Sequence, residues 1–260
     1  MHCKGSWHES ARNIVYNGDI LECELNSIDG NWIYNKLKFF PQIEYHNING
    51  ILKSNLDNLN IKFVSIGPNC STADILKENN LRIEAFPFDY IFSSLEMIKH
   101  CINNKFNIFL DKQYYTPGIC SNSTKHSFYC KLLDTPVLLN HYININFNYG
   151  DLKPSDGNLF NHHNLIDDND NYVKFVRRCE RLLNLIENNK KIVFVYYNSY
   201  TDDYNDIVDF YNNFSYNKNI YIVGIFQNNY DKKILYENTN CKIYQNYDTS
   251  YIFSEIMQNF

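Results

Sequence analysis

From residue 190 to the end of the chain, apolar runs alternate with amphipathic segments, and this alternation restricts the fold more than any other feature. The strand-like runs are 191–197, 219–226 and 241–246, and the segments predicted as helices are 203–214, 230–238 and 250–260. Such alternation is typical of βαβ units, in which helices cover both faces of a parallel sheet. The sequence therefore predicts an α/β domain with a parallel, Rossmann-like sheet in three layers.

The same alternation begins at residue 61. The run 61–67 has the composition of a buried strand, and the segment 69–79 that follows is predicted as a helix. A second helix is predicted to begin at Ser93, because Glu96 lies three residues later, as in a capping box.

A long amphipathic helix is predicted over residues 170–189. Its apolar residues recur at helical spacing, namely Val173, Val176, Leu182, Leu183 and Ile186. Residues 112–160 show no comparable pattern apart from one strand-like run at 141–149. The α/β domain is therefore expected to extend over residues 57–260.

Residues 1–56 have a different character, with short strand-like stretches separated by turn signals. The turn signals are Asn17-Gly18, Asp29-Gly30 and Asn49-Gly50. Such dipeptides between strand-forming residues are typical of hairpins. We expect a small all-β module of three or four strands over residues 1–56, with the polar segment 52–60 as the linker.

Charge, apolar runs and cysteine content argue against several classes of protein. The net charge of −5 argues against a general nucleic-acid binder, because such proteins present a basic face. The N-terminal residues lack the apolar core of a secretory signal, and the apolar runs are too short to span a membrane. The eight cysteines form no CxxC pair, so a zinc ribbon is not expected. The length and the missing secretory signal favour reduced thiols in a cytoplasmic protein.

One cysteine, Cys70, stands at the turn between a predicted strand and a predicted helix. The N-terminus of a helix presents free N–H groups and the positive end of its dipole, which would lower the pKa of a thiol there. The same N–H groups could hold the oxyanion that forms when a thiolate attacks an acyl carbonyl. Cys70 is therefore a candidate nucleophile, although a small buried cysteine is also common at such turns.

A thiol nucleophile needs a base that takes its proton. His162 and His163 stand together before the long predicted helix and are the first candidates, while His126 and His141 remain alternatives. Adjacent histidines also occur in ordinary loops. The aspartates that follow them fit the acidic start of the next helix, so no metal site is predicted.

Asp89 lies among aromatic residues in the sequence FPFDY and would need a partner if it is buried. That partner is either an imidazole or an arginine, with Arg177 and Arg178 as candidates, or the amides of a local turn. The sequence leaves both possibilities open.

Several of these motifs together resemble a known family. They lie between residues 61 and 200, and the residues that carry the resemblance are Gly67, Asn69, Cys70, Ala73, Leu76, Leu81, Arg82, Pro87, Phe88, Asp89 and Phe92, followed by the segments 106–111, 159–165 and 172–186. In order and spacing they resemble an uncharacterised family described as papain-like cysteine peptidases.

The resemblance implies roles for individual residues. It makes Cys70 the nucleophile and His162 the base, with His163 as the alternative base. Asp89 would orient the base or line the pocket, and Asn69 would help to bind the oxyanion. The description also implies an alternative fold, a papain-like α+β domain, in place of the Rossmann-like sheet.

Residues 5–52 are similar to one repeat of the cyanovirin-N homology lectins. The resemblance is carried by Ser10, Asn13, Ile14, Leu21, Gly30, Trp32, Leu37, Ile43, Asn47, Asn49 and Gly50. Ala11 and Leu25 occupy the positions that usually hold a disulfide pair. Because those lectins join two repeats in one domain, the resemblance implies a homodimer through the N-terminal module, or a module that binds nothing.

Three functions follow as hypotheses. The first is a cysteine-dependent hydrolase, most simply a peptidase, that uses Cys70 and a histidine base without a cofactor. The alternatives are an acyl- or glycosyl-transferase acting on glycans, and a non-enzymatic carbohydrate-binding protein. The expected partner is accordingly a peptide or glycan substrate.

Overall fold

The structure is a computed structural model and describes residues 5–18, 20–41, 43–54, 61–118, 122–133, 159–199, 204–228 and 230–258. Its contacts divide the chain into two units, 1–62 with 75–83 and 248–260, and 63–74 with 84–247. The predicted linker and domain boundary fall largely on residues 55–60, and the predicted strand 141–149 also lies outside the described residues.

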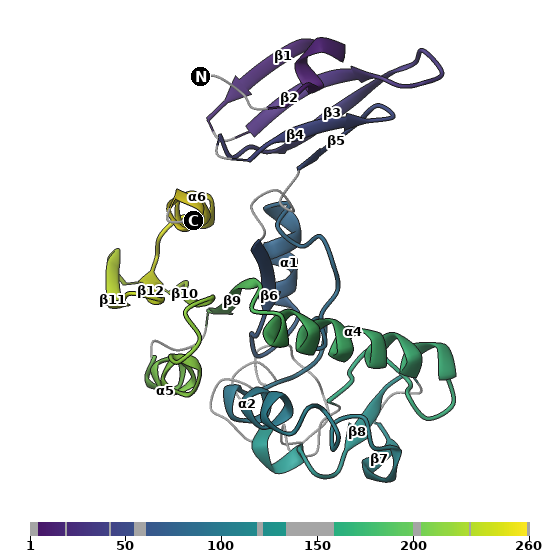
Figure 1. Cartoon of the computed structure of the whole chain (residues 1–260), viewed down its shortest axis with the longest axis vertical. Coiled ribbons are helices and arrows are strands. Elements are labelled where there is room, and N and C mark those ends of the chain that lie inside the picture. Colours follow the sequence, from purple (N-terminus) through teal and green to yellow (C-terminus); the bar gives the residue numbers. More distant parts are fainter. Residues whose placement is uncertain are drawn as a thin grey trace. The chain divides into compact units, whose positions relative to one another are not determined.

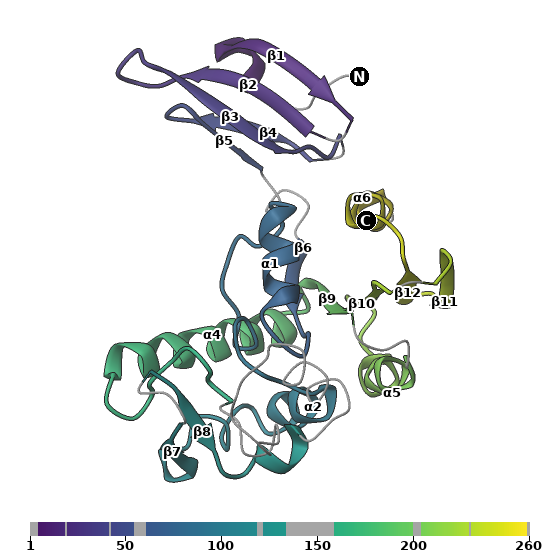
Figure 2. The same ribbon diagram turned by 180° about the vertical axis from the view of Figure 1, so that it is seen from behind.

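The N-terminal residues form two small antiparallel sheets (Figures 1 and 2). A short 3-10 helix (Trp7–Ser10) leads into a sheet of three strands, and a two-stranded hairpin follows it. The strands are β1 (Ala11–Asn17), β2 (Ile20–Asn26) and β3 (Trp32–Lys38), and then β4 (Tyr45–Ile48) and β5 (Ile51–Ser54). The all-β character is confirmed, with five strands in place of three or four.

The predicted hairpin turns are confirmed by their backbone angles. Gly18 and Gly30 have φ of 64° and 77°, and Asn49 and Gly50 have φ of 51° and 82°. Positive φ is what tight hairpin turns require, and Asn and Gly adopt it at the lowest cost. These short-range signals could be recognised without any tertiary contact.

The second unit contains a five-stranded mixed sheet in the order β11-β12-β10-β9-β6. The strands are β6 (Ile61–Ser65), β9 (Lys191–Asn198), β10 (Ile220–Phe226), β11 (Lys233–Asn238) and β12 (Cys241–Gln245). β9, β10 and β12 are parallel, whereas β11 pairs antiparallel with β12. The α/β class is confirmed, and the sheet is mixed because of β11.

The prediction of a helix over residues 230–238 is wrong, because most of this segment forms β11. The Asn238 side chain accepts a hydrogen bond from the Thr239 amide (2.7 Å), which helps to form a tight turn into β12. The backbone of β11 then pairs with β12 along the edge of the sheet. This tertiary pairing outweighs the weak helical pattern of a short segment.

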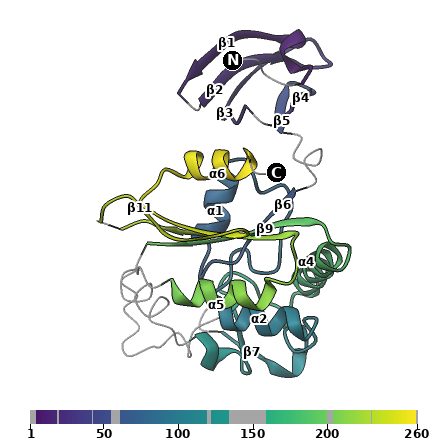
Figure 3. The same cartoon turned by 60° about the vertical axis from the view of Figure 1, so that its left-hand side comes forward.

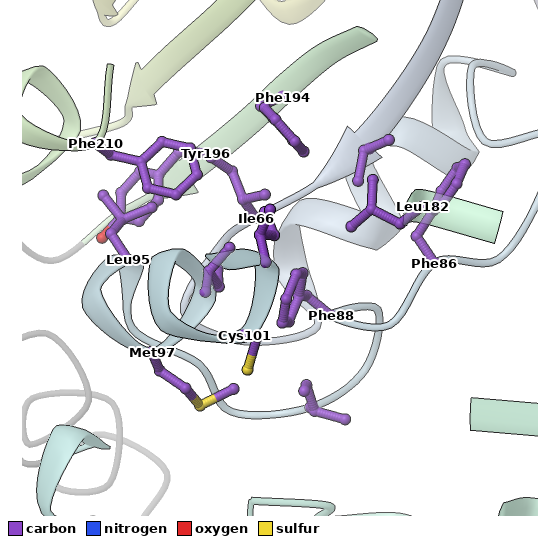
Figure 4. Close-up of a cluster of buried hydrophobic side chains, with 14 of the residues drawn as sticks. Ile66, Phe86, Phe88, Leu95, Met97, Cys101, Leu182, Phe194, Tyr196 and Phe210 are labelled. Atoms are coloured by element: carbon purple, nitrogen blue, oxygen red, sulfur yellow. The ribbon is translucent and has the colours of Figure 1, made fainter. Parts of the chain in front are cut away.

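Helices α2 (Leu95–Asn103) and α5 (Asn205–Phe214) lie on one side of this sheet (Figure 3). With α4 (Asn169–Glu187) they enclose the main core, to which alternate residues of the strands contribute. Ile66, Phe88, Cys101, Leu182 and Phe194 meet in this core (Figure 4). Every residue of β10 and β12 is buried, so both faces of the sheet are covered.

The remaining elements are short or lie outside this core. They are α1 (Ser71–Glu78), α6 (Thr249–Gln258), β7 (Tyr115–Pro117), β8 (Thr124–His126) and the 3-10 turns Lys112–Tyr114 and Cys130–Leu133. None of the helices in the described part of the chain combines the length and apolarity needed to cross a lipid bilayer.

Two predicted details of the helices are corrected. The N-cap of α2 is Ser94, whose side chain accepts a hydrogen bond from the Met97 amide, and not Ser93. In α4, Leu182 is buried as predicted, but Val173 is 42% exposed. The buried stripe of α4 consists of Phe175, Cys179, Leu182 and Leu185. Helical spacing alone did not show which side of the helix meets the core.

Candidate functional site

The chain passes from β6 directly into α1 (Figure 1). Cys70 lies between these two elements, as predicted. Its carbonyl accepts a hydrogen bond from the Asp74 amide (3.0 Å), so Cys70 is the residue that caps the first turn of α1. Its side chain is half-buried. The thiol is therefore accessible at the N-terminus of a helix, in the position that a nucleophile needs.

The turn before Cys70 is fixed by contacts from two distant segments. The Ser93 hydroxyl donates to the Gly67 carbonyl (2.7 Å), and the Ser93 amide donates to the Pro68 carbonyl (3.1 Å). The Thr72 hydroxyl accepts a hydrogen bond from the Tyr197 amide (3.2 Å) at the end of β9. The backbone around Cys70 is thereby held in one conformation.

Only glycine fits at position 67, because a Cβ there would lie 1.7 Å from Thr72 Oγ1 and 2.6 Å from Thr72 Cβ. We expect Gly67→Ala to lower the free energy of unfolding by about 2 kcal/mol, the cost of overpacking. Urea denaturation of the full chain measures the loss. Thr72→Ala removes Oγ1 and leaves Cβ, but it also removes the bond to the Tyr197 amide, so the single variant Thr72→Ala is the reference. Gly67→Ala should cost less in the Thr72→Ala background than in the wild-type chain, and an equal cost in both backgrounds would contradict this account.

Asn69 is buried directly before the cysteine, with 3% of its surface exposed. Its side-chain oxygen accepts a hydrogen bond from the Ser71 amide (2.9 Å). This bond satisfies one of the free N–H groups at the start of α1. The side chain of Asn69 is therefore anchored beside the thiol.

The prediction that Cys70 has a lowered pKa is wrong. Burial of the thiol raises its pKa, and the Asp74 carboxylate raises it further, while a local backbone hydrogen bond lowers it. Asp74 lies in the first turn of α1, where its charge offsets the positive end of the helix dipole. The Tyr90 hydroxyl holds this carboxylate with a hydrogen bond of 3.0 Å. Cys70 is thus a protonated thiol at neutral pH.

Asp89 is buried, with 1% of its surface exposed. Its carboxylate accepts a hydrogen bond from the Phe86 amide (3.0 Å), so it caps a local turn, which was one of the two possibilities that the sequence left open. Arg181 also contacts this region. It forms an ion pair with Glu84 (3.3 Å) and donates to the Ala85 carbonyl. The partnership of Asp89 with Arg177 or Arg178 stays a prediction.

His162 and His163 lie in the segment that leads into α4, and Thr124 of β8 holds this segment. The Thr124 hydroxyl donates to the His163 carbonyl (3.0 Å) and accepts from the Leu165 amide (2.9 Å). The side chain of His162 is exposed, and that of His163 is half-buried. The two rings therefore differ in their access to solvent.

His163 is neutral at pH 7. Burial lowers its pKa to about 4, and the positive charge of Arg178 contributes in the same direction. Its ring packs edge-on against Phe175, with centroids 5.0 Å apart. Its Nε2 atom is buried and has no hydrogen-bond partner among the residues that the structure describes.

Neither of the other two histidines that were considered as the base can be assigned to the site. His126 is fully buried in the core, and His141 lies outside the described residues. Among the residues that the structure describes, no hydrogen bond joins the Cys70 thiol to a histidine. Nor does this part of the chain contain three His, Cys, Asp or Glu side chains grouped as a metal ion requires. The Cys-His pair therefore stays a prediction.

Comparison with known proteins gives one match. Residues 61–220 match the model of a family described as "Putative papain-like cysteine peptidase (DUF1796)". The match begins at the first residue of β6 and includes Cys70, Asp89, His162 and His163. No curated protein and no solved structure matches the chain. The N-terminal module lies outside the matched residues, and its resemblance to a lectin repeat stays a prediction.

Proposed function

Because this chain belongs to the DUF1796 family, whose description names a papain-like cysteine peptidase, we propose that it is a cysteine-dependent hydrolase of peptide bonds with Cys70 as the nucleophile. The observation that carries the proposal is the position of Cys70. Cys70 is half-buried and stands directly before α1, in a turn that Ser93 and Thr72 fix in place. A thiol at the N-terminus of a helix suits attack on a carbonyl carbon.

The raised pKa of Cys70 determines how the reaction would start. Since the thiol keeps its proton at neutral pH, a base must take that proton as the sulfur attacks. The S–C bond forms and the carbonyl oxygen becomes an oxyanion. The amides that follow Ser71 in the first turn of α1, and the side-chain NH₂ group of Asn69, stabilise it, since the Ser71 amide is bonded to the Asn69 oxygen. The protonated base then gives its proton to the leaving amine, and water hydrolyses the acyl-enzyme.

We assign the base to His162, with His163 as the alternative. The ring of His162 is exposed, and the contact of its Nε2 atom within the described residues is with the Asn161 side-chain amide (3.4 Å). His163 has a pKa of about 4, which makes it a weak base, and its Nε2 atom is buried. Asp89 acts as a positioning residue in this proposal, since it holds the turn at Phe86.

The proposal is tested by incubating the protein with a mixture of peptides and analysing the products by mass spectrometry. Hydrolysis that stops when iodoacetamide has modified Cys70 supports it. The same spectra distinguish the transferase alternative, in which the acyl group appears on an acceptor and not as a free acid. Cleavage that persists after complete modification of Cys70 would overturn the assignment.

A separate prediction concerns the charge beside the thiol. Asp74→Asn removes the negative charge that raises the pKa of Cys70, so iodoacetamide should modify Cys70 several-fold faster at pH 7.5. The rate is measured by mass spectrometry across a pH series, and the midpoint should move to lower pH. Asp170→Asn, which removes an exposed carboxylate from α4, is the matched control and should leave the profile unchanged.

A further inference from the structure

A pocket of about 190 Å³ lies between α2 and α5. Its lining residues are Ser94, Leu95, Glu96, Lys99, Asp206, Asp209 and Phe210. α2 begins beside the turn that follows β6, and α5 follows β9, so the pocket is near the carboxyl ends of these strands. Ligands of α/β sheets bind in this position.

The lining of the pocket combines an apolar floor with an acidic rim. Leu95 and Phe210 are 7% and 2% exposed and form the floor. The rim carries three carboxylates and one ammonium group, Lys99, which leaves a net charge of −2 at neutral pH. Lysine and arginine side chains have the complementary form, with an aliphatic stem and a cationic end.

The size of the pocket fits one side chain. It exceeds the roughly 150 Å³ of a cavity that takes up benzene, and it is smaller than the roughly 300 Å³ at which pockets for drug-sized ligands begin. A bulky cofactor is therefore a poor fit, whereas a single extended side chain can fill the space.

Of the three carboxylates on the rim, Asp209 is the one whose position does not stabilise a helix dipole. Glu96 and Asp206 lie in the first turns of α2 and α5, where carboxylates stabilise the helix dipole. Asp209 lies one turn further along α5. It is next to Phe210, the buried residue at the floor of the pocket. Its carboxylate adds charge to the pocket without this benefit to the helix.

Hydrogen bonds link the segment that lines the pocket to the turn that precedes Cys70, the proposed nucleophile. Ser94, which lines the pocket, follows Ser93, and Ser93 forms hydrogen bonds with the carbonyls of Gly67 and Pro68. Cys70 is two residues beyond Pro68. We propose that the pocket binds a lysine or arginine side chain of a peptide whose neighbouring bond Cys70 attacks, an inference that rests on the proposed function.

Binding is tested apart from catalysis, in the full chain carrying Cys70→Ala. The probe is N-acetyl-arginine amide, titrated while NMR spectra are recorded, and N-acetyl-norleucine amide is the uncharged control. We expect saturable binding of the arginine probe alone, weakened by added salt. Asp209→Asn should weaken it roughly fivefold, the effect of losing one exposed ion pair, and Asp170→Asn should not.

The results of these titrations and of peptide hydrolysis distinguish failure of the pocket assignment from failure of the proposed function. Equal binding of the two probes, or no binding of either, overturns the pocket assignment whether or not Cys70 is catalytic. Arginine binding in a chain that hydrolyses no peptide supports the pocket and contradicts the proposed function. If Asp209→Asn unfolds the protein, Glu96→Gln tests the same rim from α2. In an active protein, Asp209→Asn should raise KM for peptides with arginine and leave those with norleucine unchanged.

Discussion

Cys70→Ala is expected to lower kcat/KM for peptide hydrolysis on the order of 10⁴-fold or more, because covalent attack is impossible without the sulfur. Alanine is compatible with the start of α1, and the hydrogen bonds of Gly67, Thr72 and Ser93 do not involve the thiol. The variant should therefore fold normally. The rate is measured with the peptide that the wild-type protein cleaves fastest.

Cys130→Ala is the matched control for this measurement. Cys130 is also half-buried, but it lies in the 3-10 turn Cys130–Leu133 and not at the end of a strand of the main sheet. Its loss should leave kcat/KM within about twofold of the wild-type value, as is usual for a residue away from the reacting atoms. A large loss in Cys130→Ala with full activity in Cys70→Ala would show that the wrong cysteine has been assigned.

The second large effect is a loss of stability in acid that depends on His126. Its side chain is fully buried among aromatic rings, and its Nε2 atom is hydrogen-bonded to the Ile108 carbonyl (3.1 Å). The ring of Tyr129 is 4.6 Å away, and that of Tyr114 is stacked on it at 5.6 Å. Within the described part of the chain the Nδ1 atom has no hydrogen-bond partner, so a proton added there would be buried without one.

The direction and size of the effect follow from linkage. Burial lowers the pKa of His126 to about 4, from an ordinary value of 6.5, although the backbone carbonyl of Ile108 and the charge of Asp111 oppose the shift. The unfolded chain binds a proton below pH 6.5, and the folded chain does so only below about 4. Stability is therefore lost as the pH falls through this interval, by about 3 kcal/mol in total.

Urea denaturation at pH 7.5 and pH 5.0 measures this loss. The difference between the two values should be smaller by about 2 kcal/mol in His126→Gln, whose amide can still donate to Ile108. His162→Gln removes an exposed imidazole and should leave the difference unchanged. Titration of the His126 ring by NMR provides a direct check, and a pKa near 6.5 would contradict the expected effect.

The parts of the fold that could be predicted from the sequence depend on local chemistry. Positive φ at Gly18, Gly30 and Gly50 follows from turn composition, and β9 and β10 are continuous apolar runs. β11 was mistaken for a helix because its conformation is decided by the edge of β12, which is a tertiary partner. The same limit applies to Val173, since packing decides which side of α4 is buried.

In the candidate site, too, the sequence predicts some features, whereas tertiary packing decides others. The position of Cys70 between a strand and a helix follows from the order of apolar and polar residues. The pKa of its thiol does not, because the depth of burial and the nearness of Asp74 arise only in the folded chain. The pocket between α2 and α5 could not be predicted either, since Glu96 and Asp209 are brought together by packing of helices that are distant in sequence.

The bond between Thr72 and Tyr197 also has a consequence for how the protein is made. These residues are 125 positions apart, and the Ile66 amide similarly bonds to the Val195 carbonyl. Ribosomes add roughly 5–20 residues per second, so on the order of ten seconds pass between synthesis of the cysteine turn and synthesis of the strand that completes it. A nascent chain thus carries Cys70 without its native surroundings throughout this interval, and the proposed hydrolytic activity could arise only after β9 has emerged.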